Sequence, residues 1–403
     1  MKGIFFISRR LSAKSGLAVV SVAISAVVML IALFVSSGFR SAIQGSISAV
    51  SGDMAVLSPY MDIMSEKHYV RCTDEYKDLI GGCPGVKRVL PSIYRAGIVK
   101  SGTGISGVVF KGVDSTYDFS MLSGRLVEGS FPDLRKGRIS TEAAIPLSLA
   151  QEAGVGLGDT FLAYFIGEEV KARRFRVCGI YRSPIEEQEG NFVFSDLENL
   201  RRLNGWDEES VSAIEIFLKK GEEASEVSGE VSFTVFSYSS ADDPSAIVYE
   251  TRNRFPSIFD WLDLLDFNLY AVLVLMFAVS GFNMVSGILI ILFENMSSIG
   301  LFKALGMKNR EIAKVFMAKA SSIVLKGLAI GNVIAFALGI LQDSTQFIKL
   351  NPENYIVDSV PVAFNPAGIV LLDVCAYAAI MIVLLIPCLF ISKVDPAKTV
   401  KML

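Results

Sequence analysis

The stretch Leu17–Gly38 reads LAVVSVAISAVVMLIALFVSSG and contains no charged residue. It lies inside a run of 25 uncharged residues between Lys14 and Arg40, and a second uncharged run of 27 residues separates Asp266 from Glu294. About 20 apolar residues in a helix, each rising ~1.5 Å, cover the ~30 Å hydrocarbon core of a bilayer. Both runs therefore predict membrane-spanning helices, and these helices decide the fold.

Two further apolar runs complete a set of four predicted spans. The third covers roughly Ala320–Leu341 and includes Lys326, whose ammonium group we expect to extend to the cytosolic interface. The fourth covers Gly368–Ile391, and we interpret its Asp373, near the outer end, as hydrated. A secretory signal peptide has a shorter apolar core and a small-residue cleavage site, so we interpret the first span as an uncleaved anchor.

The composition of the chain agrees with a membrane protein and argues against several other classes. Of the 403 residues, 52% are apolar and only 20% are charged, which is too apolar for an ordinary soluble or disordered chain of this length. The 38 lysine and arginine residues nearly balance the 41 aspartate and glutamate residues, giving a net charge of −3. Because no strongly basic balance is present, we expect no nucleic-acid partner.

The distribution of charge predicts the side of the membrane that each segment occupies. Segments 1–16, 294–319 and 392–403 together carry 12 basic and three acidic residues, whereas segment 342–367 carries one basic and three acidic residues. Basic residues in short segments mark the cytosolic side, so both termini are predicted to be cytosolic. The predicted order is a cytosolic N-terminus (1–16), a span (17–38), an extracytoplasmic domain (39–267), a span (268–293), a cytosolic loop (294–319), a span (320–341), an extracytoplasmic loop (342–367), a span (368–391) and a cytosolic tail (392–403).

The segment 39–267 is long enough to form a domain with its own core. We predict a mixed α/β fold, because short β-rich runs punctuated by glycine alternate with helical patterns. Ser41–Val50 is expected to continue the first helix until Gly52 breaks it, and Phe255–Phe267 is expected to lead into the second span as a helix. Strands are predicted at Arg95–Lys100, Gly107–Val113, Thr160–Phe165 and Arg174–Ile180, and helices at Thr73–Gly81, Ile145–Ala153 and Ser195–Leu203.

Residues that serve familiar catalytic or cofactor chemistry are scarce. His68 is the only histidine, which argues against histidine metal sites and histidine bases. Gly102, Gly104 and Gly107 form a GxGxxG string, which we interpret as a hairpin turn because no helix is predicted after it. The sequence contains no GxxxxGK[ST] phosphate loop, so we expect no cofactor in this chain and expect another chain to bind any ATP.

Two smaller features of the predicted outer domain concern cysteine and acidic residues. An oxidising compartment permits a bridge between Cys72 and Cys83, but the spacing alone does not establish the pairing. Glu186, Glu187 and Glu189 form an acidic cluster, which we interpret as a solvated loop in preference to a cation site.

The predicted cytosolic loop Glu294–Met317 reads ENMSSIGLFKALGMKNREIAKVFM. Ser297 or Ser298 is expected to cap a short helix, and Gly306 is expected to end it. Asn309 is expected to cap the helix that continues into the third span.

One apolar stripe is predicted on the short helix of this loop, formed by Ile299, Phe302 and Leu305. So short a helix does not bury such a stripe by itself. The stripe therefore lies either on the lipid surface or in a groove of a cytosolic partner, and the residues alone leave both alternatives open.

The same loop resembles the permease core shared by the FtsX, MacB and LolC/LolE proteins. In those ABC transporters an Ile-Gly-x-x-Lys-Ala-Leu-Gly element is the coupling helix, which is seated on the nucleotide-binding subunit. The resemblance places this ATPase-coupling helix at Ile299, Gly300, Phe302, Lys303, Ala304, Leu305 and Gly306. Further resemblances, spread over the whole chain, are Gly281-Phe282-Asn283, Ser37-Gly38-Phe39, Lys111-Gly112-Val113-Asp114, Leu350–Val362 and Asp395-Pro396-Ala397.

The lipoprotein-releasing LolC/LolE branch fits these resemblances best, since FtsX has a shorter outer domain and the MacB type carries a fused ATPase. The resemblance implies a non-catalytic, mechanotransmission-type permease of the bacterial inner membrane, with a MacB-like periplasmic core between its first two spans. It implies a cytosolic ATPase dimer, a second permease subunit, identical or paralogous, and a lipoprotein substrate extracted from the outer leaflet. A periplasmic lipoprotein carrier is a further implied partner, although Phe165–Phe175, which corresponds to the carrier-binding hairpin of LolC, is short.

An alternative function is that of an FtsX-like regulator, which transmits ATPase-driven motion to an enzyme outside the membrane. The first span also carries a set of small residues, which we interpret either as helix-packing positions or as a lining for the substrate. These residues are Ser21, Ala23, Ser25 and Ala26.

Overall fold

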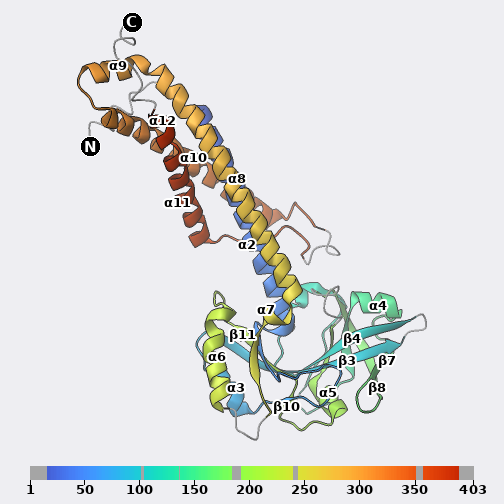
Figure 1. The fold of residues 1–403 in the computed structure, drawn as a ribbon. Helices are drawn as coiled ribbons and strands as arrows, with labels where there is room; N and C mark the ends of the chain where they lie inside the picture. The colour runs from blue at the N-terminus through green and yellow to red at the C-terminus, as the bar shows by residue number, and fades with distance from the viewer. Residues whose placement is uncertain are drawn as a thin grey trace. The chain divides into compact units, whose positions relative to one another are not determined.

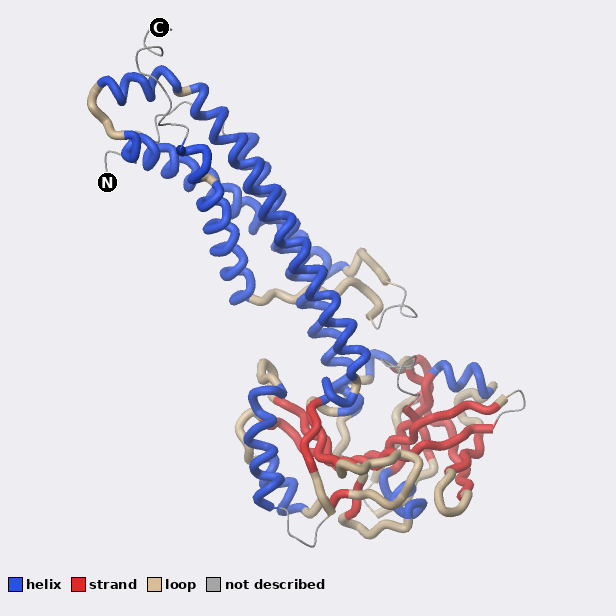
Figure 2. Tube along the Cα trace, in the orientation of Figure 1, coloured by secondary structure: helices blue, strands red, loops and turns tan. Residues whose placement is uncertain are grey.

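The computed structural model describes residues 16–100, 104–135, 137–183, 192–238, 244–350 and 357–389. The chain forms two compact units, which we call the helical unit (residues 1–42 and 261–403) and the sheet unit (residues 43–260). Figure 1 follows the chain through both units, and Figure 2 shows that strands occur in one of them and long helices in the other. Helix α2 (Gly16–Ser51) and helix α8 (Pro256–Glu294) each contribute residues to both units.

The helical unit contains the predicted spans. Four helices of the described chain are long and apolar enough to cross a membrane, which confirms the predicted number of spans. The predicted spans 17–38, 268–293 and 320–341 lie inside longer helices. The four helical segments are α2, α8, α10 (Asn309–Thr345) and Pro366–Pro387, and the short helix α9 (Met296–Ala304) connects α8 to α10.

The last span is interrupted near its end. Helix α11 covers Pro366–Val383 and helix α12 covers Leu385–Leu389. Pro387 has no backbone N–H to donate, and a proline ring crowds the carbonyl group four residues earlier, which here belongs to Val383. The first helix therefore ends at that residue.

One buried apolar cluster holds the helices of this unit together. It contains Leu30 of α2, Met284 of α8, Phe316 of α10 and Ile380 of α11, each at most 1% exposed. Many large apolar side chains on the same helices stay exposed, as expected for helices whose outer faces contact lipid.

The sheet unit is built on a ten-stranded mixed sheet in the order β12-β1-β11-β3-β4-β9-β6-β8-β5, with β7 paired to β3 and β8. The pairs β4–β9 and β6–β8 are parallel, and the other pairs are antiparallel. A separate two-stranded sheet pairs β2 (Val70–Arg71) with β10 (Ser210–Val211). The strands of the large sheet are β1 (Met54–Leu57), β3 (Val86–Lys100), β4 (Ile105–Val113), β5 (Leu126–Gly129), β6 (Glu142–Pro146), β7 (Thr160–Phe165), β8 (Lys171–Tyr181), β9 (Phe192–Asp196), β11 (Ala213–Leu218) and β12 (Ile247–Glu250).

Helices cover this sheet and complete its core, as the predicted α/β fold requires. Ile80 of one helix and Val231 of another are fully buried in the same cluster as Val56 of β1. Two 3₁₀ turns, Phe119–Met121 and Ser123–Arg125, precede β5. The α-helices of this unit are α3 (Asp74–Gly81), α4 (Leu147–Ala153), α5 (Leu197–Asn204), α6 (Ala224–Tyr238) and α7 (Thr251–Arg254).

The predicted strands and helices of this unit are all present, but β3 begins nine residues before the predicted start at Arg95, and the other ends differ by up to three residues. Ser195 belongs to β9, because Asp196 Oδ1 accepts a hydrogen bond from the N–H of Glu198 at 3.0 Å and so caps α5 one residue later. Ile145 likewise belongs to β6 and precedes α4. Gly52 has a φ of +74°, which ends α2 where the sequence predicts.

The glycine-rich string lies at a hairpin, as predicted. Strands β3 and β4 pair from Ser92↔Val113 to Lys100↔Ile105, and Gly107 pairs with Ile98. Residues 101–103 at the turn lie outside the described residues. The hairpin of β7 and β8 is short, since Phe165 pairs with Lys171 and only residues 166–170 connect the strands.

The disulfide that the sequence left open is not formed. Cys72 and Cys83 are buried free thiols at opposite ends of α3. The eight residues of α3 rise about 12 Å at ~1.5 Å each. Bridged cysteines keep their Cα atoms within about 7 Å of each other, so the helix separates the two thiols. Burial raises the pKa of the Cys72 thiol to about 12, which keeps it protonated at neutral pH.

Candidate functional site

Helix α9 is the predicted ATPase-coupling helix, and it is joined closely to the helix before it. Asn295 alone separates α8 from α9, and its backbone N–H donates to Ile291 O at 3.2 Å while its carbonyl accepts from Ile299 N at 3.0 Å. The cap position is therefore Asn295, and the expected cap at Ser297 or Ser298 is wrong. The helical hydrogen bonding hardly breaks at this junction, so no serine is needed there.

The C-terminal end of α9 is closed by a glycine, as predicted. Gly306 has a φ of +89°, and its N–H donates to Lys303 O at 3.0 Å. The N–H of Met307 donates to Phe302 O at 3.0 Å, which completes the Schellman arrangement of a helix end. Helix α10 then begins at Asn309, with Lys308 in the cap position, so the expected cap at Asn309 is displaced by one residue.

The predicted apolar stripe of α9 is divided between two environments. Ile299 is 1% exposed in the core of the helical unit and Phe302 packs against that core, whereas Leu305 is 76% exposed. The stripe is divided because neighbouring helices cover only one side of α9. The exposed side begins at Ser297 and continues with Leu301, Ala304 and Leu305, and we call these last three residues the α9 face.

The structure therefore places the seven predicted coupling residues in three settings. Ile299 and Gly300 are buried, Phe302 and Lys303 are half-buried, and the last three, Ala304, Leu305 and Gly306, are exposed. Leu301, which is 55% exposed, is missing from the predicted set. Its spacing of four residues from Leu305 is the signal that places both on one side of a helix.

Helices α2 and α10 approach each other closely at small residues. A Cβ atom at Gly327 would lie 2.6 Å from Val22 Cβ, and one at Gly331 would lie 2.6 Å from Ala26 Cβ. The Gly327–Gly331 spacing is the small-xxx-small pattern of packed membrane helices. At Ala26, and at Ala23, whose carbonyl oxygen is also close to Gly331, the helix-packing interpretation of the small residues is therefore confirmed.

Helices α2 and α8 are linked by ion pairs within the helical unit. Arg40 pairs with Asp266 through Nη1 and Oδ2, and its Nη2 lies 3.8 Å from Asp263 Oδ1. Ser36 Oγ also donates to Asp266 Oδ1 at 3.0 Å. One arginine and two carboxylates thus join these two helices at residues next to the predicted spans.

Two of the sequence resemblances meet in space at Gly38. A Cβ atom at Gly38 would lie 2.2 Å from Pro361 O, so only glycine allows the segment before the fourth span to lie against α2 there. The N–H of Ala363 donates to Phe34 O at 3.1 Å, and the Phe34 ring packs edge-on against Phe364. The Ser37-Gly38-Phe39 resemblance therefore marks a close contact of α2 with this segment.

The charged residues in the predicted spans have different surroundings. Asp373 of α11 is half-buried, and its Oδ1 and Oδ2 accept from Asn332 Nδ2 of α10 at 3.2 and 3.0 Å. A carboxylate bonded to a neighbouring helix replaces our interpretation of a simply hydrated one. Lys326 is exposed on α10, and the extension of its ammonium group to the interface stays a prediction.

The Lys111-Gly112-Val113-Asp114 resemblance lies in the core of the sheet unit. Lys111 is fully buried and pairs with Glu215 of β11 at 2.8 Å. Gly112 packs against α5, because a Cβ atom there would lie 3.0 Å from Leu197 Cα. Among the residues described, no group of three or more His, Cys, Asp or Glu side chains is placed to hold a metal ion, and the acidic cluster Glu186–Glu189 lies outside them.

Two families of known proteins match consecutive parts of the chain. Residues 15–264 match the MacB-like periplasmic core domain, and residues 270–396 match the FtsX-like permease C-terminal domain. The two matches meet near the start of the second span.

Relatives in sequence are similar to the chain over nearly its full length, and a solved structure is similar to about half of it. The lipoprotein-releasing system transmembrane protein LolC of Neisseria meningitidis is 21% identical over 95% of this chain and 92% of its own length. The corresponding protein LolE of Haemophilus influenzae is 20% identical over 94% of this chain and 92% of its own length. The periplasmic region of MacB from Actinobacillus actinomycetemcomitans aligns with a TM-score of 0.36 and 13% identity, over 54% of this chain and 97% of that structure.

Proposed function

We propose that this chain, which belongs to the LolC/LolE family of permeases with a MacB-like periplasmic core domain and an FtsX-like C-terminal domain, transmits force from a separate ATPase to lipoproteins. Its relatives are permease components of lipoprotein-releasing systems, and it is an integral membrane protein with four spans. The proposed complex contains a cytosolic ABC ATPase dimer and a second permease subunit, either another copy of this chain or a paralogue.

The α9 face is the observation that supports this proposal most directly. Leu301 and Leu305 are 55% and 76% exposed on a nine-residue helix that has an otherwise buried side. Covering such side chains stabilises an interface by about 1.5–3 kcal/mol each. The segment Ile299–Gly306 also resembles the family's coupling helix, and on these grounds we assign the α9 face to the ATPase and place both termini and α9 in the cytosol.

Displacement of α9 would be passed to the two neighbouring helices. The helical hydrogen bonds through Asn295 join α9 to α8, and the closed turn at Gly306 joins it to α10. Because Ile299 is buried among these helices, α9 does not move independently of them. We propose that ATP-driven closure tilts these spans and that the motion reaches the outer domain through α2 and α8.

The proposed substrate is a lipid-anchored protein in the outer leaflet of the inner membrane. Removing acyl chains from a bilayer costs about 0.8 kcal/mol per CH₂ group, so release of whole chains needs a coupled energy source. We propose that the anchor enters between α2 and α8, the helices joined by Arg40 and Asp266. Release to a periplasmic carrier then follows, and no carrier contact is assigned to the short β7–β8 hairpin.

Substitution of Leu305 by aspartate tests the assignment of the α9 face. Leu305→Asp places a charge in the proposed interface, and we expect the co-purifying ATPase to fall at least tenfold while membrane insertion is unchanged. Leu79→Asp is the matched control, since Leu79 is a 45% exposed leucine on α3. Undiminished co-purification of the ATPase with Leu305→Asp contradicts the docking assignment.

Depletion of the chain in cells separates lipoprotein release from regulation of an outer enzyme. Retention of lipoproteins in the inner membrane after depletion is the expected result. A cell-wall defect with normal lipoprotein sorting would instead favour an FtsX-like regulator and contradict the proposed substrate.

A further inference from the structure

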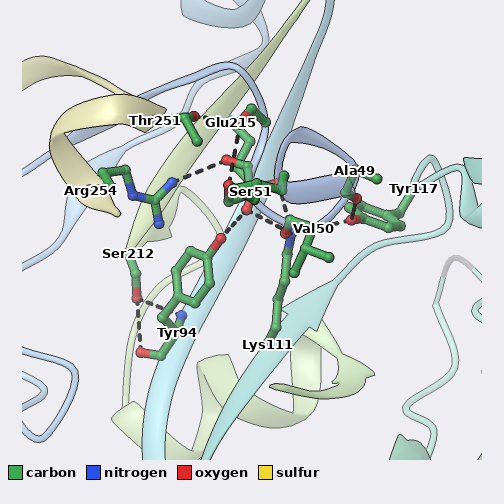
Figure 3. Close-up of polar contacts among 12 residues, drawn as sticks. Ala49, Val50, Ser51, Tyr94, Lys111, Tyr117, Ser212, Glu215, Thr251 and Arg254 are labelled. Carbon is green, nitrogen blue, oxygen red and sulfur yellow. Dashed lines mark hydrogen bonds and ion pairs between the residues drawn. The ribbon is translucent and has the colours of Figure 1, made fainter. Parts of the chain in front are cut away.

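The C-terminal end of α2 is held by side chains from the sheet unit. The last carbonyl groups of an α-helix have no partner within the helix, and here those of Ala49, Val50 and Ser51 each accept a side-chain hydrogen bond (Figure 3). The carbonyl group of Gly52, directly after the helix, accepts a fourth. The donors, which we call the helix-end socket, are Tyr117 Oη to Ala49 O at 2.8 Å, Lys111 Nζ to Val50 O, Arg254 Nη1 to Ser51 O at 3.1 Å and Thr251 Oγ1 to Gly52 O at 2.6 Å.

A buried carboxylate completes the helix-end socket. Glu215 of β11 is fully buried, accepts from Lys111 Nζ at 2.8 Å and accepts from the hydroxyl group of Tyr94. The ammonium group of Lys111 also lies 4.7 Å from the centre of the Tyr117 ring, and the guanidinium group of Arg254 lies 5.3 Å from the centre of the Tyr94 ring. Each cation at this site therefore has polar and aromatic partners.

Stability alone does not account for a charged pair at this position. Replacing a buried ion pair by apolar side chains of similar size is often neutral or stabilising, because desolvation of the charges offsets their attraction. The pair instead helps to hold the end of α2 in place, because Lys111 donates to Val50 O. Lys111 and Arg254 bring positive charge to the C-terminal, negative end of the α2 dipole, and hydrogen bonds hold the last turn of α2, which belongs to the sheet unit, in a fixed place on the sheet.

The helix-end socket also includes residues of the segment that leads from the sheet unit into α8. Thr251 and Arg254 belong to α7, which directly precedes α8, and the N–H of Thr251 donates to Asp53 O at 3.0 Å. Lys111 belongs to β4 and Glu215 to β11, on either side of the long strand β3. The end of α2, the segment before α8 and the middle of the sheet are therefore joined through one set of polar contacts.

We infer that Lys111 and Glu215 are positioning residues for force transmission, which make the end of α2 and the segment α7 move together with the sheet. This inference rests on the proposed function, because it assumes that ATPase-driven motion of the long helices is put to use outside the membrane. Without the pair, the domain still folds and ATP is still hydrolysed, but hydrolysis is uncoupled from release.

The experiment uses the complete ATPase–permease complex in lipid nanodiscs, and measures lipoprotein released per ATP hydrolysed. In the double variant Lys111→Met/Glu215→Met, both charges are replaced by apolar side chains of similar length. We expect a folded variant with wild-type ATPase activity and at least a tenfold fall in release per ATP, with a melting temperature lowered only by the hydrogen bonds that Val50 O and the Tyr94 hydroxyl lose. Normal release per ATP in this folded variant would overturn the inference.

A matched control removes a second largely buried ion pair of the sheet unit. Arg95 and Glu66 pair at 2.6 Å with side chains 4% and 16% exposed, and neither contributes to the helix-end socket. Arg95→Met/Glu66→Met is expected to leave release per ATP unchanged. An equal fall in this control would show that any lost buried pair has the effect, and would contradict a special role for Lys111 and Glu215.

A second variant keeps the test decisive if the first does not fold. Tyr117→Phe/Thr251→Val removes two hydrogen bonds to the end of α2 without leaving a buried charge, and we expect a two- to fivefold fall in release per ATP. An unchanged ratio overturns the inference. Failure of the proposed function itself is recognised separately, since the wild-type complex would then show no ATP-dependent release at all.

Discussion

Helix α9 leaves Leu305 76% exposed, whereas the end of α2 lies against Lys111, Tyr117 and Thr251, whose side chains are buried, and against the half-buried Arg254. The α9 face has apolar side chains and no covering element within the described chain. The helix-end socket has charged and hydroxyl groups, and each backbone carbonyl there has a donor from the same chain. An uncovered apolar surface calls for another molecule, while a completed polar network leaves no place for one. The partner binding and the internal transmission that we propose thus depend on opposite physical chemistry.

The largest expected effect follows from breaking the ion pair at the helix-end socket. Lys111→Met leaves Glu215 as a buried charge without its cation, which we expect to lower the free energy of unfolding of the sheet unit by about 3–5 kcal/mol. Urea unfolding of the full chain in detergent measures this loss, followed by fluorescence of Trp206 in a Trp261→Phe background. Lys77→Met is the control, because Lys77 pairs with the exposed Asp74 and its loss should cost at most about 1 kcal/mol. Equal denaturation midpoints for the two variants would contradict the prediction.

A smaller effect is expected from shortening a side chain of the α9 face. Leu301→Ala removes most of one side chain from the α9 face, and we expect the ATPase to bind the permease about 10- to 30-fold more weakly, or about 1.4–2 kcal/mol. Titration of the ATPase onto the permease in nanodiscs measures this change, while the melting temperature of the permease should not move, because Leu301 is 55% exposed in the free chain. Unchanged affinity would remove Leu301 from the interface.

The last expected effect is a pH dependence at the helix-end socket, which is the smallest of the three when it is expressed per pH unit. Burial lowers the pKa of Lys111 from 10.5 to about 8, although the Glu215 carboxylate opposes the shift and Arg254 adds to it. Between pH 8 and 10.5 the unfolded chain then binds more protons at this lysine than the folded chain does. The free energy of unfolding therefore rises with pH in that window, by at most about 1.4 kcal/mol per pH unit.

A comparison of variants isolates this pH dependence. Unfolding of the wild type and of Lys111→Met/Glu215→Met is measured at a series of pH values from 7.5 to about 10, again by Trp206 fluorescence. The difference, wild type minus double variant, should increase towards high pH. A flat or falling difference would mean that the lysine is not held at a lowered pKa.

The sequence predicts the helical unit and the ends of α9 better than the helix-end socket, because the signals for helices and their ends are local. Charge-free runs fix the number of spans, and Gly306 marks the end of α9 through its own backbone conformation. The division of the apolar stripe was not predictable in this way. Whether Ile299 or Leu305 is buried depends on where α8 and α10 lie, and no periodicity within nine residues contains that information.

The helix-end socket depends on contacts between distant parts of the chain. Lys111 and Glu215 are separated by 104 residues, and no spacing rule connects a lysine in one strand with a glutamate in another. The predicted helix at Thr73–Gly81, by contrast, already contained the argument against a Cys72–Cys83 bridge, since a helix between two cysteines holds them apart. The Gly327–Gly331 spacing was also present in the sequence as a helix-packing signal.

The contact at Gly38 ties α2 to the segment before α11. Pro361 and Val362 lie against the helix at this glycine, and Ala363 is hydrogen-bonded to Phe34 one turn earlier. When α2 tilts, the segment leading into α11 has to travel with it, because the backbone there leaves no room for even a methyl group. A fluorescent probe on Ser359, two residues before Pro361, would thus report the proposed tilting of α2 from a position outside the described helices.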